Sequence, residues 1–282
     1  MKKILITGAN SYIGTSFENY IRQNYPDEYV VDTIDMIDGT WKEKSFSEYD
    51  SVFHVAGIAH KKETKQNAYL YYEVNRDLAV KTAKKAKADG VGQFIFLSSM
   101  SIYGMDTGVI TKETKPSPQS HYGKSKWQAE QEIAQLGSEG FQVCILRPPM
   151  VYGKGCKGNF NSVKKLVEKL PIFPYVKNQR SMIYIDNLSS FVRMCVDKEL
   201  SGVYFPQNRG YISTVAMARG IATALQKKIC LEYLTGAAVV VMRLFLPIAK
   251  KGFGTLIYQD TEEFAFSYIC VENEQSFLLS IL

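Results

Sequence analysis

A short apolar strand that leads directly into a glycine turn and a helix constrains this chain most. Lys3–Thr7 is typical of a buried strand, and Thr15–Asn24 has the spacing of an amphipathic helix. Between them, Gly8 allows backbone angles closed to other residues, and Gly14 allows close packing of the helix on the strand. Free N–H groups at the start of such a helix bind pyrophosphate. The predicted dinucleotide-binding loop comprises Gly8, Asn10, Ser11, Tyr12, Ile13 and Gly14.

Ser11 stands where the usual fingerprint of such a loop has its middle glycine, so an ordinary strand-to-helix connection is the alternative. Strands and helices then alternate along the chain. Further strands are predicted at 29–36, 51–56, 93–98 and 142–147, with helical segments between most of them. This alternation of continuous apolar strands with helices predicts an α/β fold, in which a parallel sheet is covered on both faces.

The composition is ordinary for a globular protein. The chain has 282 residues, of which 46% are hydrophobic and 22% charged, enough for a large core with a smaller lobe. The five cysteines lack paired metal-ligand spacing, and an odd number without a signal peptide favours reduced thiols. We therefore expect no metal site and a cytoplasmic location.

The net charge of +6 raises the question of a nucleic-acid partner. Lysines cluster at 61–65 and at 81–87, and the second cluster lies on a predicted helix over 67–89 whose apolar residues face inward. Aromatic residues do not alternate with these lysines, and no known nucleic-acid-binding module accompanies them. The pattern indicates solvated helix faces, so we expect no nucleic acid and an anionic small molecule as partner.

Three acidic residues, Asp32, Asp35 and Asp38, surround the end of the second predicted strand, and no arginine lies among them. An acid at this place accepts hydrogen bonds from the adenosine ribose and repels a 2′-phosphate, which favours NAD over NADP. Asp35 lies 21 residues after Gly14, close to the expected spacing of roughly 20. We therefore select Asp35, while Asp32 and Asp38 remain open and solvated strand-end acids are the alternative.

Two further segments supply a hydroxyl, a phenol and an ammonium in an order suited to proton transfer at an alcohol. Ser98, Ser99 and Ser101 follow the strand over 93–98, and Tyr122 and Lys126 are spaced by one helical turn. A phenol has an ordinary pKa of about 10, and a nearby ammonium lowers it. We expect Lys126 to act on Tyr122 in this way.

These motifs resemble the extended short-chain dehydrogenase/reductase superfamily, and within it the NAD-dependent epimerase/dehydratase family. Seven matching pieces occur in the family's order; they are Thr7–Gly14, His54–Gly57, Val74–Asn75, Leu97–Ser99 with Tyr103–Gly104, Tyr122–Lys126, Leu146–Pro149 with Tyr152–Gly153, and Arg180–Asp186. An ordered series is far more specific than any single piece. Beyond about Leu200 no matching piece is recognised.

The resemblance implies a Rossmann-type doubly wound parallel sheet with a smaller, discontinuous substrate-binding lobe. We expect a dinucleotide-binding domain over 1–150 plus the helix 186–197, and a substrate-binding lobe over 151–185 and 198–282. The resemblance also assigns residues. Ser99, Tyr122 and Lys126 would be catalytic, and Ser99 would bind the reacting oxygen. Ala56, Gly57, Tyr122 and Lys126 would contact NAD, with Lys126 on the nicotinamide ribose. The substrate would contact Ser99, Tyr122 and Arg180, and the Arg180 guanidinium would hold a nucleotide diphosphate. Independently of the resemblance, the glycines and lysines of the loop Tyr152–Asn159 suit contact with a diphosphate or sugar, so Asn159 is a further candidate; a mobile polar loop is the alternative.

The residues after Ser99 narrow the expected reaction. In the family's 4,6-dehydratases an Asp-Glu pair follows the catalytic Ser or Thr, whereas Met100 and Ser101 stand here. Dehydration is therefore disfavoured. We expect an NAD-dependent 4-epimerase of a UDP-hexose or UDP-N-acetylhexosamine for surface polysaccharide synthesis, acting through a 4-keto intermediate. The alternatives are an NAD(P)H-dependent 4-ketoreductase of a UDP- or dTDP-deoxy sugar and a non-catalytic dinucleotide-binding sensor module.

The most apolar window, 236–249, has 14 residues and contains Arg243. A bilayer-spanning helix needs about 20 apolar residues, so we expect a buried helix or a lid in the substrate lobe and no integral membrane segment. The sequence leaves open the role of this window and of the C-terminal tail, and also whether the chain forms a homodimer.

Overall fold

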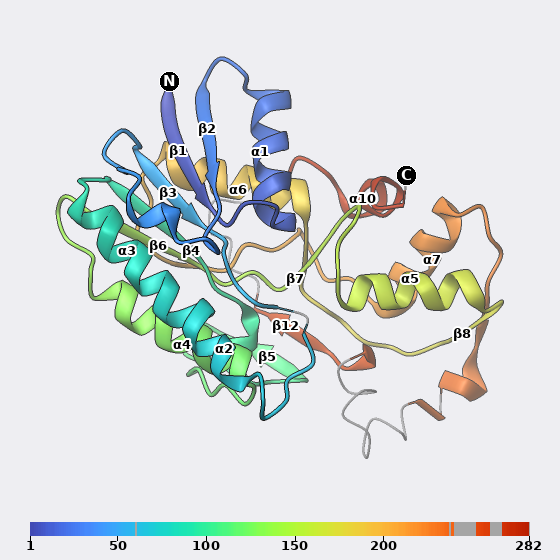
Figure 1. The fold of residues 1–282 in the computed structure, drawn as a ribbon. Helices are drawn as coiled ribbons and strands as arrows, with labels where there is room; N and C mark the ends of the chain where they lie inside the picture. The colour runs from blue at the N-terminus through green and yellow to red at the C-terminus, as the bar shows by residue number, and fades with distance from the viewer. Residues whose placement is uncertain (60, 237, 240–251, 260–266, 282) are drawn as a thin grey trace. The chain divides into compact units, whose positions relative to one another are not determined.

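The computed structural model describes residues 1–59, 61–236, 238–239, 252–259 and 267–281. These residues form two compact units, each built from several stretches of the chain (Figure 1). The first unit comprises 1–104, 116–148 and 188–206, and the second comprises 105–115, 149–187 and 207–282. Most of the apolar window 236–249 lies outside the described residues.

The first unit contains a six-stranded sheet in which every strand is parallel to its neighbours. The strand order is β10-β6-β4-β3-β1-β2, with β1 (Lys2–Thr7), β2 (Tyr29–Ile34), β3 (Ser51–His54), β4 (Gln93–Leu97), β6 (Gln142–Leu146) and β10 (Gly202–Tyr204). The chain passes from β1 to β2 on one side and then to β3 on the other. This order places the topological switch point between β1 and β3, where open α/β sheets bind their ligands.

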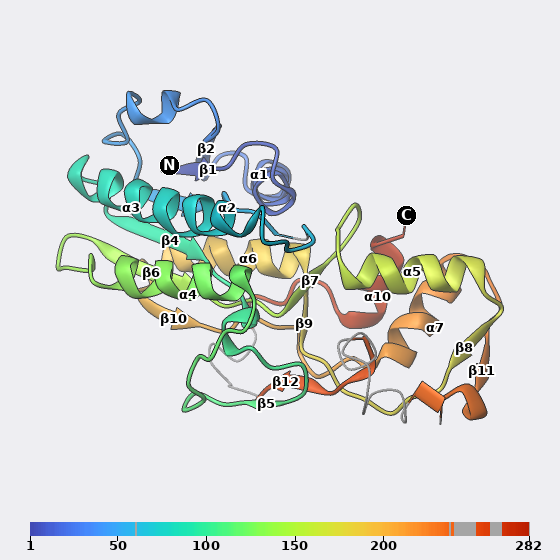
Figure 2. The same cartoon turned by 60° about the horizontal axis from the view of Figure 1, so that its bottom comes forward.

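Helices cover both faces of this sheet, as the alternation in the sequence predicted. They are α1 (Tyr12–Asn24), α2 (Ala68–Tyr72), α3 (Ala79–Ala88), α4 (His121–Ala134) and α6 (Ile185–Asp197), with a π-helical segment (Glu73–Leu78) between α2 and α3 and short 3₁₀ helices at Thr40–Lys42 and Met100–Tyr103. Helices α3 and α4 lie side by side on one face (Figure 2). On the opposite face, the rings of Phe17 in α1 and Phe53 in β3 meet edge to face with centroids 5.4 Å apart.

Alternate residues of the central strands divide between these two layers because side chains of a strand point to opposite faces. Leu5 of β1 and Phe94 of β4 belong to one buried cluster with Ala83 of α3 and Ile133 of α4. The sheet is thus apolar on both sides, which is why its strands are continuous hydrophobic runs.

The second unit combines three small parallel strand pairs with helices. The pairs are β5 (Gly108–Ile110) with β12 (Leu256–Tyr258), β7 (Met150–Tyr152) with β9 (Met182–Tyr184), and β8 (Ile172–Pro174) with β11 (Cys230–Glu232); the helices are α5 (Asn159–Lys169), α7 (Thr214–Ala224) and α10 (Asn273–Leu279). The tail helix α10 packs into this unit, since Phe277 stacks on Phe160 and Ser276 hydrogen-bonds to the Tyr152 hydroxyl at 2.6 Å.

The division of the chain differs from the expected boundaries at two places. Residues 105–115 belong to the second unit because β5 pairs with β12. Residues 198–206 belong to the first unit because β10 completes the large sheet beside β6. Both pairings join segments more than 50 residues apart, and short strands of three residues carry too little periodicity to reveal such partners.

A buried neutral histidine makes the first unit sensitive to acid. His54 is fully buried, and its Nδ1 lies 2.8 Å from the Thr7 hydroxyl. Burial, and to a smaller extent the charge of Lys126, lowers the pKa of His54 to about 3. Because the unfolded chain takes up this proton near pH 6.5, the contribution of His54 to stability is complete above that pH and is lost as the pH falls toward 3.

We expect the free energy of unfolding to fall by ~2 kcal/mol between pH 6.5 and pH 5 on account of His54. Urea unfolding near pH 7 and near pH 5 measures this loss. The His54→Asn variant, although less stable throughout, should show a smaller loss over this range. An equal loss in the two proteins would contradict the prediction.

Candidate active site

The glycine turn lies at the carboxyl end of β1, beside the switch point. Gly8 has a φ of +119°, and a Cβ there would lie 2.8 Å from the main-chain nitrogen of Ala56. The main-chain N–H groups of Gly8 and Ala9 both donate to the Ile34 carbonyl, at 3.0 and 3.1 Å. The turn is therefore packed closely between the ends of β2 and β3, in a conformation that only glycine adopts readily at its first position.

Ser11, at the place of the missing glycine, directly precedes α1. Its side chain accepts a hydrogen bond from the Gly14 N–H at 3.2 Å and so caps the helix. A Cβ on Gly14 would lie 2.6 Å from this hydroxyl and 3.0 Å from a methyl group of Ile6. Gly14 thus permits the close contact of helix and strand, and the serine supplies a cap that a glycine lacks. Asn10 between them has a positive φ of 61°.

The three acids near the end of β2 differ in their contacts. The Asp32 carboxylate accepts a hydrogen bond from the Tyr49 hydroxyl at 2.8 Å, and the Asp38 carboxylate accepts two from Thr40. Asp35 follows directly after Ile34, whose carbonyl holds the glycine turn, and it accepts the N–H of Ile37 at 2.8 Å. Of the three, Asp35 therefore lies nearest in the chain to the end of β2 where the turn is bound.

Ser99 and Tyr122 meet at the ends of β4 and α4. Ser99 follows β4 and caps the short helix Met100–Tyr103, with its hydroxyl 3.1 Å from the Ser101 N–H. The Ser99 hydroxyl lies close enough to the Tyr122 phenol to act on its pKa. Burial raises the pKa of the Tyr122 phenol, Ser99 lowers it as a hydrogen-bond partner, and Tyr71 raises it. Ser98, by contrast, is buried and hydrogen-bonded to Glu130.

Lys126 lies one helical turn after Tyr122 and is only 4% exposed. Its ammonium donates to the Leu97 carbonyl at 2.8 Å and lies 4.7 Å from the centre of the Phe96 ring. Burial lowers the pKa of Lys126 to about 8, against an opposing effect of Glu130. The expected lowering of the Tyr122 pKa by Lys126 is not seen, because in this structure the ammonium is directed to the end of β4.

The segment that carries Ala56 and Gly57 leads from β3 toward Lys126. The Ala56 N–H donates to the Thr7 carbonyl at 2.9 Å, and a Cβ on Gly57 would lie 3.4 Å from the Lys126 nitrogen. The buried Asn75 side chain holds the next residue, Ile58, through both its N–H and its carbonyl, at 2.7 and 3.1 Å. Asn75 is thus a structural support of the site that its residue type alone did not reveal.

A second residue that sequence reasoning missed is Glu130, one turn after Lys126. Its carboxylate is 1% exposed and accepts hydrogen bonds from Ser98 and from the Arg147 guanidinium, with the nearest Arg147 nitrogen at 2.6 Å. Arg147 also donates to the Tyr103 hydroxyl at 2.8 Å. The only signal in the sequence was the four-residue spacing from Lys126, which placed both on one face of a helix.

The two predicted substrate residues outside this group belong to the second unit. Asn159 is exposed at the start of α5. Arg180 is half-buried, its guanidinium donates to the Gly254 carbonyl at 2.9 Å, and its main chain pairs with Ile212. Burial lowers the pKa of Arg180, and the charge of Asp106 opposes this.

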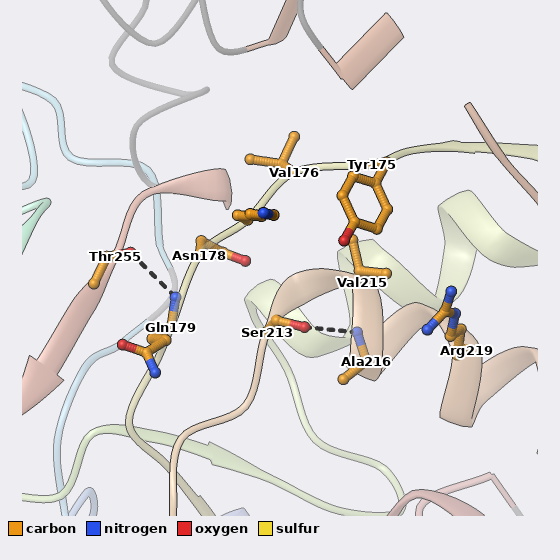
Figure 3. Close-up of a pocket in the computed structure, with 10 residues that line it drawn as sticks. Tyr175, Val176, Asn178, Gln179, Ser213, Val215, Ala216, Arg219 and Thr255 are labelled. Atoms are coloured by element: carbon orange, nitrogen blue, oxygen red, sulfur yellow. Dashed lines mark hydrogen bonds between the residues drawn. The ribbon is translucent and has the colours of Figure 1, made fainter. Parts of the chain in front are cut away.

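A cavity of about 420 Å³ opens in the second unit between the segment before Arg180 and the start of α7 (Figure 3). Its lining includes Tyr175, Lys177, Gln179, Ser213, Arg219 and Thr255. Neither Asn159 nor Arg180 is part of this lining, although Gln179 precedes Arg180 in the chain. Among the described residues, two basic side chains and no acid line the cavity.

The described part of the chain contains no group of three histidine, cysteine, aspartate or glutamate side chains arranged to hold a metal ion. None of its helices has both the length and the apolar character needed to cross a membrane.

Comparison with known proteins identifies the family. Residues 4–204 match the model of the NAD dependent epimerase/dehydratase family. The chain belongs to this family. It is 33% identical over 251 residues to a UDP-glucose 4-epimerase of Vibrio cholerae, covering 80% of this chain and 76% of that one. It is therefore an enzyme of the isomerase or oxidoreductase class, a sugar-nucleotide epimerase or reductase.

Solved structures confirm the predicted Rossmann-type fold. A UDP-glucuronic acid 4-epimerase of Bacillus cereus in complex with NAD has a TM-score of 0.76 and 18% identity, with 99% of this chain and 95% of that one covered. A dTDP-4-dehydrorhamnose reductase of Clostridium acetobutylicum has a TM-score of 0.76 and 19% identity, with 99% and 98% covered. NAD is the cofactor in the family's name. The turn at the start of α1 has the glycines that such a site requires, since neither Gly8 nor Gly14 leaves room for a side chain.

We expect Gly8→Ala to abolish or strongly weaken NAD binding, since the added methyl would lie against the Ala56 main chain and strain a φ of +119°. Gly140→Ala is the matched control, because a Cβ there meets nothing within 4 Å. Calorimetric titration with NAD measures the dissociation constant of each folded variant. Equal NAD affinity in the two variants would contradict the assignment of this turn.

Proposed function

We propose that this enzyme is an NAD-dependent 4-epimerase of a UDP-hexose or UDP-N-acetylhexosamine. The observation that carries the proposal is the placement of Ser99 beside Tyr122, one helical turn from the buried Lys126, in a unit that also holds the glycine turn. The Vibrio cholerae relative, named a UDP-glucose 4-epimerase, supports the choice of reaction. Met100 and Ser101, in place of an acid pair, argue against dehydration.

We assign the contacts with the cofactor to residues of the first unit. The turn from Gly8 to Gly14 binds the pyrophosphate, Asp35 binds the adenosine ribose, and Ala56 with Gly57 lines the path toward the nicotinamide. Lys126 binds the nicotinamide ribose. NAD, when bound, supplies a reversible hydride acceptor at C4 of the sugar.

In the proposed mechanism, the Tyr122 phenolate takes the proton of the C4 hydroxyl while the Ser99 hydroxyl donates a hydrogen bond to the same oxygen. Oxidation at C4 gives the 4-keto sugar. Tyr122 returns its proton to the C4 oxygen when the carbon is reduced from the opposite face. Because burial raises the Tyr122 pKa, the phenolate requires a stabilising charge. The ammonium of Lys126 would supply it on turning toward the phenol from the Leu97 carbonyl, to which it donates in this structure.

Charge distribution supports an anionic substrate. The first unit contains 18 basic and 18 acidic residues, and the second contains 16 basic and 10 acidic residues. The whole excess of +6 is therefore carried by the unit that contains Asn159 and Arg180. We assign the substrate contacts in this unit to Asn159 and Arg180, with the Arg180 guanidinium on the diphosphate. None of the five cysteines forms a disulfide, which supports a cytoplasmic reaction.

Incubation of the NAD-loaded enzyme with UDP-glucose, UDP-galactose and their N-acetylated counterparts tests the reaction. We expect proton NMR to show the C4 epimer without added reductant. The Tyr122→Phe variant should lose at least about a hundredfold in turnover, since it lacks the acid-base group, and should still bind NAD. Undiminished turnover of this variant would remove Tyr122 from the mechanism.

The same set of UDP-sugars distinguishes the epimerase from the alternative, a 4-ketoreductase. A 4-ketoreductase would leave these sugars unchanged and would oxidise NADH or NADPH in the presence of a 4-keto sugar nucleotide. The dTDP-4-dehydrorhamnose reductase of Clostridium acetobutylicum, which has the same fold, is the reason for testing this alternative.

We expect Arg180→Ala to raise the Michaelis constant for a UDP-sugar by about tenfold or more, because a charged hydrogen bond to the diphosphate is lost. Arg209→Ala is the control, since Arg209 is an exposed arginine of the same unit that pairs only loosely with Glu272 at 3.7 Å. Steady-state kinetics of both variants measure the effect. Equal Michaelis constants would remove Arg180 from the substrate site.

A further inference from the structure

The carboxylate of Glu63 holds the first turn of α4 from outside the helix. One oxygen accepts the His121 N–H at 2.9 Å, and the other accepts the Tyr122 N–H at 3.0 Å. The first N–H groups of a helix have no partner within it. Ser120 takes the Gly123 N–H at 3.0 Å, so the first turn is bound by a side chain from each of two segments. The main chain of Tyr122 is thereby fixed.

Glu63 is itself held in place by its neighbours. The Asn67 side chain donates to the Lys62 carbonyl at 3.0 Å and accepts the Thr64 N–H at 2.9 Å, which fixes the residue on each side of Glu63. The Tyr71 hydroxyl of α2 donates to the Lys61 carbonyl at 2.9 Å. The carboxylate is thus presented to α4 by a constrained turn.

This arrangement bears on chemistry because the atoms that Glu63 binds belong to the proposed acid-base residue. The Tyr122 phenol must lie within hydrogen-bond reach of Ser99 and of the reacting oxygen. A displacement of about 1 Å in such a group can cost a hundredfold in rate. The two N–H groups form charge-assisted hydrogen bonds to the carboxylate, and these are stronger than bonds to a neutral acceptor.

We propose that Glu63 is a positioning residue for Tyr122. Its carboxylate fixes the first turn of α4, and with it the direction from which the phenol meets the substrate oxygen. The proposal rests on the proposed acid-base role of Tyr122. A helix cap that only stabilises the fold is the alternative, and it would affect the amount of folded enzyme without affecting the rate of each folded site.

The test compares Glu63→Ala and Glu63→Gln with Glu132→Gln, which changes an exposed carboxylate of the same helix. Epimerisation of a UDP-sugar is measured on the full-length enzyme, and rates are divided by the concentration of bound NAD. We expect Glu63→Ala to lower kcat about tenfold or more, with the Michaelis constant and NAD affinity within about twofold of the parent values. The kcat of Glu63→Gln should lie between those of Glu63→Ala and the parent, since the glutamine amide oxygen still accepts one N–H. Glu132→Gln should match the parent.

Two outcomes would overturn the proposal and can be told apart. If kcat per NAD-loaded site is unchanged in both Glu63 variants while their thermal midpoints fall, Glu63 is only a helix cap. If Tyr122→Phe keeps the parent turnover, the acid-base role of Tyr122 fails and the positioning role fails with it. Should Glu63→Ala not fold, a parent value of kcat in Glu63→Gln decides against the proposal.

Discussion

The carboxylate of Glu130 joins helix α4 to the ends of two neighbouring strands. Ser98, directly after β4, and Arg147, directly after β6, both donate to it, and all three side chains are buried or nearly so. Loss of one partner of such a buried pair typically costs 3–5 kcal/mol, because the remaining charge has no water to solvate it. The ion pair therefore sets the position of α4 along the sheet.

The position of α4 in turn places the proposed chemistry. Tyr122, Lys126 and Glu130 are spaced by four residues, so they share one face of the helix. With Glu130 bound at the strand ends, Lys126 reaches the Leu97 carbonyl and Tyr122 reaches Ser99. Glu63 binds the first turn of α4, at the Tyr122 end of this helix face. The structural ion pair of Glu130 with Arg147 and the phenol of Tyr122 therefore share one face of the helix.

The sequence predicted the first unit well because its signals are local. Strand periodicity predicted β1, β2, β3, β4 and β6, and the glycine motif predicted the tight connection from β1 to α1. Short strands such as β10 and β5 were missed, because their pairing depends on segments far along the chain.

Among the site residues, the choice of Ser99 over Ser98 and Ser101 came from motif register, and the structure places only its side chain, of the three, among the groups that act on Tyr122. Glu63 was hidden in a lysine-rich stretch typical of a solvated loop, and its role depends on contacts with residues more than 50 positions away. Such contacts leave no periodic signal in a single sequence.

Isotope transfer at C4 of the sugar tests whether epimerisation proceeds by oxidation and re-reduction. We expect the NAD-loaded enzyme to epimerise a UDP-sugar with deuterium at C4 more slowly than the protium form. The deuterium should stay on C4 in both epimers because it leaves and returns as hydride. Mass spectrometry and proton NMR of the product report this label. Replacement of the deuterium by solvent hydrogen during epimerisation would show that the C4 hydrogen leaves as a proton, and would contradict hydride transfer.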